Sequence, residues 1–301
     1  WKTHRKLVSL NFHYEYLHSY VPEIAHVARE IFEKQKKKDL KNVNIMEVFQ
    51  KVTGETIGRL FFGDEFGEYS IQGRPAIDFI ADLMNRLAQE SMGSLYKSFG
   101  VKLIKAGILP RHKKLMDDIR VFRDFCKGIL NQRMKEISEE TKKGEIKARK
   151  DMLEHFYEQR LQHPVESLSD EEIIDEVATF FMAGMDTTGH LTTMASYFLA
   201  KNPQYKQKLL DEIDIYYKDY SKIEFDDLNK MDFMTATLKE TLRMATPSPT
   251  VFNRVALVDH MIGHVKVKKG TQITTSFISN NFDERFHNDP ETRSEEHTSE
   301  L

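Results

Sequence analysis

Residues 182–188 read Met-Ala-Gly-Met-Asp-Thr-Thr and lie well inside a long apolar run with helical spacing. Ser, Thr and Asp are usually found at helix ends, because in helix interiors their side chains compete for backbone hydrogen bonds. Here an acid, two hydroxyls and a glycine stand where leucines would pack a core. A glycine and hydroxyl groups at mid-helix can also widen the adjacent groove. We therefore expect this helix to line a site with space for a small ligand.

Local signals set the ends of this helix. Ser169 followed by Glu172 predicts a capping box at the start, and Asn202-Pro203 predicts the end. The helix would then contain about thirty residues and measure roughly 45 Å. Apolar side chains occur around much of its circumference, so we expect burial on most sides.

Other charged and aromatic residues stand at spacings that bring side chains together. Trp1 and Arg5 are four residues apart, which places an aromatic ring and a guanidinium on one helical face. Glu240 and Arg243 are three apart, a common spacing for a helical salt bridge. Arg254 follows a turn that contains two prolines. Each pattern is weak alone, and it is their order that is informative.

The ordered motifs resemble the cytochrome P450 (haem-thiolate monooxygenase) family. They read W-x-x-x-R, A-G-x-D-T-T, E-x-x-R and a proline turn that leads to an arginine. Segments 52–63, 198–213 and 281–292 also resemble the family, so the likeness covers nearly the whole chain. Ser248 separates two prolines that are usually adjacent in the family, which is a mild departure. The resemblance implies a fold that is mainly α with a small antiparallel β-sheet.

Periodicity agrees with that fold. Helical spacing dominates to about residue 246. A polar segment, 139–150, predicts an exposed loop, and Lys34–Lys38 predicts a solvated helix end. We expect one partial catalytic domain of the cytochrome P450 type over residues 1–292, without an internal repeat. Alternation predicts short antiparallel strands within 255–264, 265–268 and 272–276.

The resemblance assigns chemistry to the centre of the long helix. Asp186 and Thr187 match the acid and alcohol that relay protons during the family's oxygen activation. A carboxylate in such a groove would be desolvated and protonated, whereas a hydroxyl can both donate and accept. Ala183 and Gly184 match positions that approach the distal face of a haem b group, where small side chains allow close contact. The simpler alternatives are a polar helix kink and incidental glycine packing.

The charged motifs match two further sets of family positions. Trp1, Arg5 and Arg254 match partners of the haem propionates, since guanidinium groups and an indole N–H suit two carboxylates. Surface ion pairs are the simpler alternative. Glu240 and Arg243 match a structural network on the proximal side of the haem, which does not touch substrate.

The single cysteine, Cys126, does not match the family's iron ligand. It lies in a helical run, 121–133, whereas the family's cysteine stands near the C-terminus in a glycine-rich loop. We expect Cys126 to be a small buried apolar residue, and we expect no metal ligand in this chain. The arginine that would complete a network with Glu240 and Arg243 is missing as well.

We therefore expect an internal fragment of a longer protein, inactive by itself. The first residue, Trp1, already belongs to a motif, and the likeness stops at residue 292. Residues 293–301 read Arg-Ser-Glu-Glu-His-Thr-Ser-Glu-Leu and resemble a translated sequencing adapter. We exclude them from the fold as an expected artefact.

Composition indicates a globular protein. Of the 301 residues, 40% are hydrophobic and 30% are charged, unlike a disordered chain. The net charge of −3 gives no basic field for nucleic acid. One cysteine suits a reducing compartment, and no apolar run approaches the roughly 20 residues of a membrane-spanning helix.

The function implied by the resemblance is that of a monooxygenase. Such an enzyme inserts one oxygen atom of O2 into an organic, lipophilic substrate, with electrons that come from NADPH through a reductase partner. The likeness also implies the cytoplasmic face of the endoplasmic reticulum membrane. The motifs do not fix the substrate, which depends on variable segments such as 92–109, so fatty acids, sterols and xenobiotics remain open.

Two other functions are compatible with parts of the sequence. A non-catalytic helical binding or scaffold protein would explain the composition. A metal hydrolase could use His260 and His264, which are four residues apart. On a strand this spacing separates them by about 13 Å, too far for one metal ion.

Overall fold

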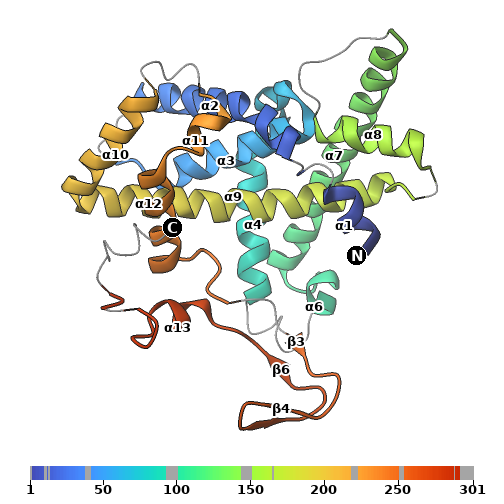
Figure 1. Ribbon diagram of the computed structural model, residues 1–301. Coiled ribbons are helices and arrows are strands. Elements are labelled where there is room, and N and C mark those ends of the chain that lie inside the picture. The colour runs from blue at the N-terminus through green and yellow to red at the C-terminus, as the bar shows by residue number, and fades with distance from the viewer. Residues whose placement is uncertain are drawn as a thin grey trace. The chain divides into compact units, whose positions relative to one another are not determined.

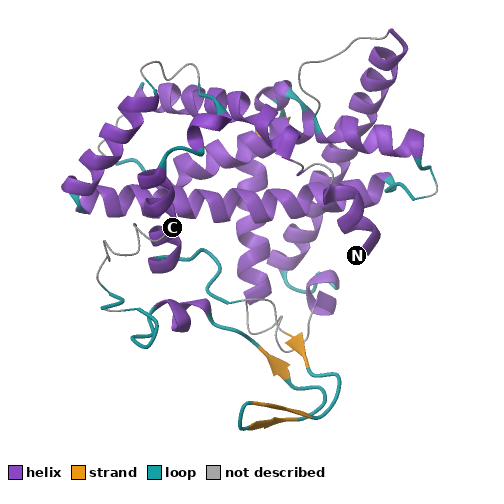
Figure 2. Ribbon diagram, in the orientation of Figure 1, coloured by secondary structure: helices purple, strands orange, loops and turns teal. Residues whose placement is uncertain are grey.

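The chain forms two compact units, one of Trp1–Gly189 with Ser221–Phe225 and one of His190–Tyr220 with Asp226–Leu301. Helices dominate and strands are short (Figure 1, Figure 2). The fold is mainly α with small antiparallel sheets, as the sequence predicted. The computed structural model describes residues 2–9, 12, 14–37, 42–92, 101–143, 151–164, 166–217, 223–250, 254–287 and 289–291.

The first unit is built from helices that follow one another along the chain. α3 packs against α2, α4, α7 and α8, so it lies at the centre of this unit. The connection from α3 to α4 contains the 3-10 helix η2 (Asp64–Glu68) and an antiparallel hairpin of β1 (Ser70–Ile71) and β2 (Arg74–Pro75). The helices are α1 (Lys2–Ser9), α2 (Tyr14–Lys36), α3 (Ile45–Phe62), α4 (Ala76–Met92), α6 (Val101–Lys105), α7 (Pro110–Lys143), α8 (Met152–Gln162) and the first part of α9 (Asp170–Lys201).

An aromatic cluster closes the core where α3 meets η2. The ring centroid of Phe66 lies 5.9 Å from that of Phe62 and 5.7 Å from that of Phe181 on α9. The Phe66 ring also covers Gly58, where an added Cβ atom would lie 2.0 Å from the nearest ring atom. Glycine at this position therefore lets a buried ring reach the backbone of α3.

A buried ion cluster joins α2 to α3. The guanidinium of Arg59 donates hydrogen bonds to Glu30 at 2.7 Å, to Glu55 at 3.0 Å and to Glu23 at 3.3 Å. Burial raises the pKa of Glu55, whereas hydrogen bonds from Lys34 and Arg59 lower the pKa of Glu30 to about 2. Because several carboxylates share one guanidinium, loss of Arg59 alone would leave uncompensated buried charge.

The second unit contains the rest of α9 and the helices and strands that follow it. The carboxylate of Glu212 accepts hydrogen bonds from the backbone N–H groups of Phe233 and Met234, both at 2.8 Å, and so caps the first turn of α12. β3 pairs with β6 and β4 pairs with β5, both antiparallel. The elements are α10 (Pro203–Tyr216), α11 (Phe225–Leu228), α12 (Asp232–Met244), β3 (Arg254–Val255), β4 (His260–Ile262), β5 (Val265–Val267), β6 (Gln272–Ile273) and α13 (Phe277–Asn281). The first residue of α11, Phe225, belongs to the first unit.

The predicted ends of α9 are confirmed, and Figure 1 shows it as one unbroken helix. The backbone N–H of Ser169 donates to the carboxylate of Glu172 at 2.9 Å, and the backbone N–H of Glu172 donates to the Ser169 hydroxyl at 3.4 Å. α10 begins at Pro203. The prediction that α9 is buried on most sides was wrong, because Met182 and Tyr197 are 47% and 48% exposed. The buried face consists of Ile173, Ile174, Val177, Phe181 and Met185.

Two expectations about helix ends have different outcomes. α7 continues to Lys143, so the expected loop is wrong for residues 139–143, and residues 144–150 lie outside the described part of the chain. Ile137 is buried, and an ion pair of Arg133 with Glu140 at 3.6 Å lies along this last part of the helix. The lysine run is confirmed as a helix end up to Lys36, where α2 stops, and residue 38 lies outside the described part of the chain.

The predicted strands are present but shorter. The expected strand 255–264 divides into the end of β3 and the whole of β4, and Gly263 and Gly270 take positive φ angles of 57° and 86° in the turns that follow β4 and β5. The single domain expected over residues 1–292 stays a prediction. Within the part of the chain that the structure describes, no helix combines the length and apolar character needed to cross a bilayer.

We expect Gly58→Ala to lower the free energy of unfolding of the full-length protein. Overpacking costs about 1–3 kcal/mol, and the Phe66 ring cannot move aside because Phe62 and Phe181 flank it. That cost outweighs the gain in helix propensity, which is at most about 1 kcal/mol. Urea denaturation followed by circular dichroism measures the change.

Gly128→Ala is the matched control. Gly128 lies in α7, and an added Cβ atom would meet nothing within 4 Å. Only the propensity gain applies there, so this variant should be as stable as the wild type or more stable. Equal effects of the two substitutions would contradict the packing of Phe66 on Gly58.

Candidate functional site

In the first unit, α9 meets α3 at very close range. An added Cβ atom at Gly184 would lie 2.7 Å from Cδ1 of Ile57, and one at Gly189 would lie 3.1 Å from Cγ of Gln50. The hydroxyl of Thr53 donates to a carbonyl oxygen of α9, that of Met185, at 2.9 Å. Glycines on α9 therefore allow side chains of α3 to contact its backbone directly.

The side chain of Asp186 is turned toward α3. Its Oδ1 accepts a hydrogen bond from Nε2 of Gln50 at 3.0 Å. Burial raises the pKa of this half-buried carboxyl group, and the hydrogen bond from Gln50 opposes the rise. The desolvation expected for Asp186 is thus present, and the group exchanges a proton closer to neutral pH than an exposed aspartate does.

Thr187 lies on a different side of α9 from Asp186. Its side chain is exposed, and its Oγ1 donates to the carbonyl oxygen of Ala183 at 2.6 Å. Ala183, one turn earlier on the same face, is exposed next to it, whereas the exposed Met182 lies one turn before Asp186. We call the surface made of Ala183 and Thr187 the open face of α9. It combines a hydroxyl and a small residue at the middle of the helix.

The structure separates Ala183 from Gly184, which the sequence had grouped together. Ala183 belongs to the open face, whereas Gly184 packs against Ile57 of α3. The structure therefore gives Gly184 a role in helix–helix contact, and a role toward a haem face stays a prediction.

Two residues that contact this region were not predicted from the sequence. Gln50 and Thr53 hydrogen bond to α9 from positions 136 and 132 residues earlier in the chain. The available signal was the run of glycine and polar residues at 53–58 inside a helix, most of which are buried. Such residues at buried helical positions indicate close contact with another helix.

α1 carries the first arginine motif. Arg5 is exposed, while Leu7 is buried and its carbonyl oxygen accepts a hydrogen bond from Nε2 of Gln159 on α8 at 3.1 Å. Trp1 lies outside the described residues, so its place beside Arg5 stays a prediction.

In the second unit, Glu240 and Arg243 form the predicted pair on α12. Arg243 donates from Nε and from one terminal nitrogen to the two carboxylate oxygens of Glu240, both at 2.8 Å. Its other terminal nitrogen donates to the carbonyl oxygens of Asn281 at 3.0 Å and Pro290 at 2.8 Å. Arg243 therefore ties α12 to α13 and to the segment after it.

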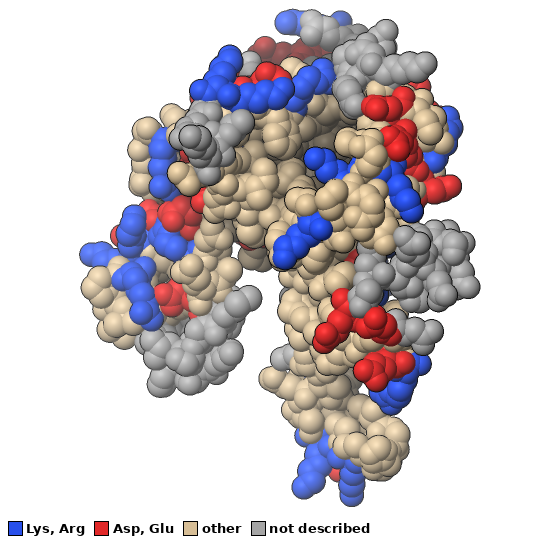
Figure 3. Space-filling model, turned by 90° about the vertical axis from the view of Figure 1, so that its left-hand side faces the viewer, with Lys and Arg blue, Asp and Glu red and all other residues tan. Residues whose placement is uncertain are grey.

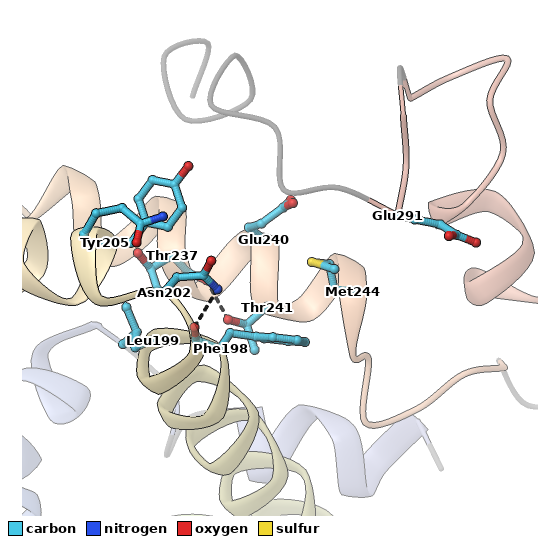
Figure 4. Close-up of a pocket in the computed structure, with 10 residues that line it drawn as sticks. Phe198, Leu199, Asn202, Tyr205, Thr237, Glu240, Thr241, Met244 and Glu291 are labelled. Atoms are coloured by element: carbon cyan, nitrogen blue, oxygen red, sulfur yellow. Dashed lines mark hydrogen bonds between the residues drawn. The ribbon is translucent and has the colours of Figure 1, made fainter.

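A pocket of about 340 Å³ lies beside this pair, between the end of α9, the start of α10 and α12 (Figure 4). Phe198 and Leu199 give it apolar walls, while Glu240 and Glu291 give it acidic ones. Thr237 is 4% exposed, and its hydroxyl has no hydrogen-bond partner among the residues that the structure describes. The pocket therefore suits a group that carries positive charge and N–H donors.

Arg254 and Cys126 are the remaining predicted residues. Arg254 is exposed at the start of β3, opposite Ile273 in the strand pair. Cys126 is 1% exposed on α7, and burial raises the pKa of its thiol. The prediction that Cys126 is a buried apolar residue is confirmed.

A metal site built on histidine is not supported. His260 lies on β4, but His264 lies in the turn after that strand, so they do not share one strand. Among the described residues, no group of His, Cys, Asp or Glu side chains could hold a metal ion.

Figure 3 shows acidic and basic side chains near one another at several places, with uncharged surface between them. Ion pairs also form along single helices: Nζ of Lys34 lies 2.6 Å from Oε1 of Glu30 on α2. Such exposed pairs contribute little to stability.

The chain as a whole matches a known family. The family model for cytochrome P450 matches residues 1–297, and the chain therefore belongs to the cytochrome P450 family. It is similar to cytochrome P450 4A10 of Mus musculus, with 26% identity over 284 residues that cover 92% of this chain and 54% of the relative.

Other relatives come from other organisms. Secologanin synthase 1 of Catharanthus roseus is 26% identical over 286 residues, which cover 91% of this chain and 51% of the relative. A self-sufficient cytochrome P450 monooxygenase of Exserohilum turcicum is 29% identical over 237 residues, which cover 77% of this chain and 20% of the relative. The chain spans about half the length of the mouse and Catharanthus relatives.

A solved structure agrees in fold. The crystal structure of the cytochrome P450DA heme domain matches with a TM-score of 0.73 and 19% identity, and the match covers 96% of this chain and 59% of that chain. At this identity the likeness shows the fold alone.

We expect Arg243→Ala to destabilise the second unit strongly. Removal of the guanidinium leaves the buried carboxylate of Glu240 unpaired, which costs about 3–5 kcal/mol, and frees the carbonyl oxygens of Asn281 and Pro290. Arg243→Lys keeps the charge but not the paired hydrogen bonds of the guanidinium, so its stability should lie between those of the wild type and Arg243→Ala. Hydrogen exchange of α12 and α13 measures the loss.

Arg285→Ala is the control for this prediction. Arg285 pairs with Asp283 on the surface and its side chain is 81% exposed, so its loss should cause no measurable change. An Arg243→Ala protein as stable as Arg285→Ala would contradict the clamp around Arg243.

Proposed function

We propose that the protein to which these residues belong is a haem-dependent monooxygenase that inserts one oxygen atom of O2 into an organic substrate. Its membership of the cytochrome P450 family supports this proposal. The single observation that carries it is the open face of α9. A helix that is buried on its other side exposes a hydroxyl and a small residue one turn apart, within the motif that resembles the family's haem-facing positions.

The open face is compatible with one side of a haem. Ala183 is small, so a flat macrocycle can approach α9 closely at this point. Thr187 adds a hydroxyl on the same face. We propose that these residues contact the haem, or the space above it, in the full-length protein.

The haem carboxylates require cationic partners. Arg5 and Arg254 are exposed guanidinium groups that suit this role, because guanidinium binds carboxylates through paired hydrogen bonds. We propose the indole N–H of Trp1 as a third donor. Cys126 does not suit the iron, because its thiol is buried with a raised pKa and the thiolate is the form that binds metals. We therefore assign the iron ligand to no residue of this chain.

Asp186 and Thr187 are proposed to move protons. The bound haem supplies the binding and reduction of dioxygen, which consumes protons from the protein. Asp186 stores one readily because burial raises its pKa. The Thr187 hydroxyl donates to Ala183 and keeps its lone pairs free to accept. Since the two side chains face different sides of α9, we propose that a water molecule links them.

The pocket beside Glu240 has a proposed occupant of its own. We propose that it receives the arginine that completes the network of Glu240 and Arg243, contributed by a part of the protein outside this chain. The acidic groups of Glu240 and Glu291 and the unpaired hydroxyl of Thr237 support a guanidinium at this place.

Family membership supports further proposals about the function. We propose a lipophilic organic substrate, electrons from NADPH through a reductase, and a location at the cytoplasmic face of the endoplasmic reticulum membrane. Substrate choice is proposed to depend on variable segments such as 92–109, of which residues 93–100 lie outside the described part of the chain.

We expect the full-length protein to give the carbon monoxide difference spectrum of thiolate-ligated haem, and the 301-residue chain not to give it. Full-length Cys126→Ser is the matched control and should keep the spectrum, because Cys126 is a buried packing residue. Loss of the spectrum in Cys126→Ser would contradict the role given to Cys126. A full-length protein that binds no haem would favour the alternative, a non-catalytic helical scaffold.

We expect Thr187→Val to divert electrons from product to hydrogen peroxide in the full-length protein with its reductase. General acid catalysis contributes on the order of 10²-fold, so productive turnover should fall by about that factor. The measurement is the hydrogen peroxide released per NADPH oxidised.

Thr179→Val is the control for proton delivery. The Thr179 hydroxyl makes the same kind of bond, to the carbonyl oxygen of Asp175 at 2.8 Å, and is exposed two turns earlier on α9. The ratio of peroxide to NADPH should stay at the wild-type value. An equal rise in both variants would show that the hydroxyl of Thr187 has no special part in the reaction.

A further inference from the structure

His4 of α1 lies between two carboxylates of α9. Its Nδ1 is 2.8 Å from Oε1 of Glu176, and its Nε2 is 3.1 Å from Oε1 of Glu172. The two glutamates are four residues apart, so they stand on the same face of α9 in successive turns. A single imidazole ring therefore bridges two helices of the first unit.

Both of these contacts require a protonated ring. A neutral imidazole has one N–H donor, and its second nitrogen would turn a lone pair toward a carboxylate oxygen. An imidazolium donates from both nitrogens. The hydrogen bond with Glu176, followed by that with Glu172, raises the pKa of His4. Glu172 stays ionised in this range, because its hydrogen bonds with Ser169 lower its pKa to about 2.

Charged and neutral side chains of neighbouring helices lie around His4. Within the described residues, Glu172 and Glu176 are the acidic groups that face it from α9, and α8 contacts α1 through the neutral side chain of Gln159. On α1 itself the neighbouring Lys6 pairs with Glu166 at 3.4 Å. The protonation of His4 therefore decides whether the bridge to α9 is attractive.

The bridge adds to a small set of contacts that the structure describes for α1, which include the packing of Leu7 and Val8 on the core. It has eight residues, too short to be stable as an isolated helix. Among the side chains that the structure describes on it, Leu7 is the buried one, and its carbonyl oxygen accepts from Gln159. Two charge-assisted hydrogen bonds are a large addition to so small an interface. The His4 side chain is 31% exposed, so dissolved salt weakens them in part.

We propose that His4 is a positioning residue whose imidazolium holds α1 on α9, and that loss of its proton at higher pH loosens α1 and, with it, the grip of Arg5 on the haem. This inference rests on the proposed function, since it takes the haem carboxylates as the partners of Arg5. His4 itself touches neither haem nor substrate.

The direction of the pH dependence follows from the raised pKa. A histidine whose folded-state pKa lies above its unfolded value of 6.5 stabilises the fold fully at lower pH. That contribution disappears as the pH rises through the folded-state pKa. The attachment of α1 should therefore be firm below pH 6.5 and weaken as the pH rises above that value through the folded-state pKa of His4.

The experiment compares wild type, His4→Gln and His4→Lys in the full-length protein at several pH values on both sides of neutrality. One readout is hydrogen exchange of residues 2–9, corrected for the intrinsic pH dependence of exchange. The other is the rate at which haem transfers to excess apomyoglobin. Neither readout depends on turnover, so no substrate is needed.

In the wild type, we expect the hydrogen-exchange protection of α1 to fall about tenfold as rising pH removes the proton of His4. The rate of haem loss should rise over the same pH range. His4→Gln should show low protection and fast haem loss at every pH. His4→Lys supplies a cation throughout, so it should restore both properties and remove their pH dependence. His26→Gln is the control, because His26 is 62% exposed and lies 3.9 Å from Glu30 on α2.

Identical pH profiles of α1 protection in wild type and His4→Gln would overturn the bridge. A profile that changes in α1 without any change in haem loss would overturn the link from α1 to the cofactor. If the full-length protein takes up no haem, the proposed function fails together with that link, while the exchange data still decide separately whether His4 holds α1.

Discussion

The close approach of α3 and α9 is the constraint on which the candidate site depends. Gly184 and Gly189 remove the side chains that would hold the two helices apart, and Gln50 and Thr53 use the space to hydrogen bond to α9. This contact fixes the rotation of α9 about its own axis. It turns Asp186 inward to α3 and leaves the open face, with Thr187, on another side.

The acid and the alcohol are neighbours in sequence, but the fold gives them different surroundings. Asp186 is half-buried and accepts from an uncharged amide, which leaves its proton affinity high. Thr187 is exposed and bonds to the backbone of its own helix. The fold therefore gives two adjacent side chains different exposure and different hydrogen-bond partners.

Local sequence signals predicted the parts of this structure that local interactions determine. The capping box at Ser169, the stop at Pro203 and the strands after residue 254 all depend on neighbours within a few residues. The pair of Glu240 and Arg243 is local in the same way. The order of the motifs along the chain indicated the family resemblance.

The contacts that were missed join distant parts of the chain. Gln50 reaches Asp186 across 136 residues, and no periodicity in either helix specifies that partner. Gly184 is ambiguous for a different reason, since a residue without a side chain is equally suited to a flat ligand and to a neighbouring helix. One-sided burial of α9 also escaped prediction, because apolar residues such as Met182 and Tyr197 remain exposed.

The clamp around Arg243 has a consequence for the order of events on the ribosome. Its guanidinium donates to the carbonyl oxygen of Pro290, which is synthesised 47 residues later. At roughly 5–20 residues per second, α12 therefore waits several seconds before its last acceptor is made. During that interval Arg243 can engage Glu240 but keeps N–H groups in contact with water. Final burial of this helix is thus a late step, timed by translation of the chain beyond α13.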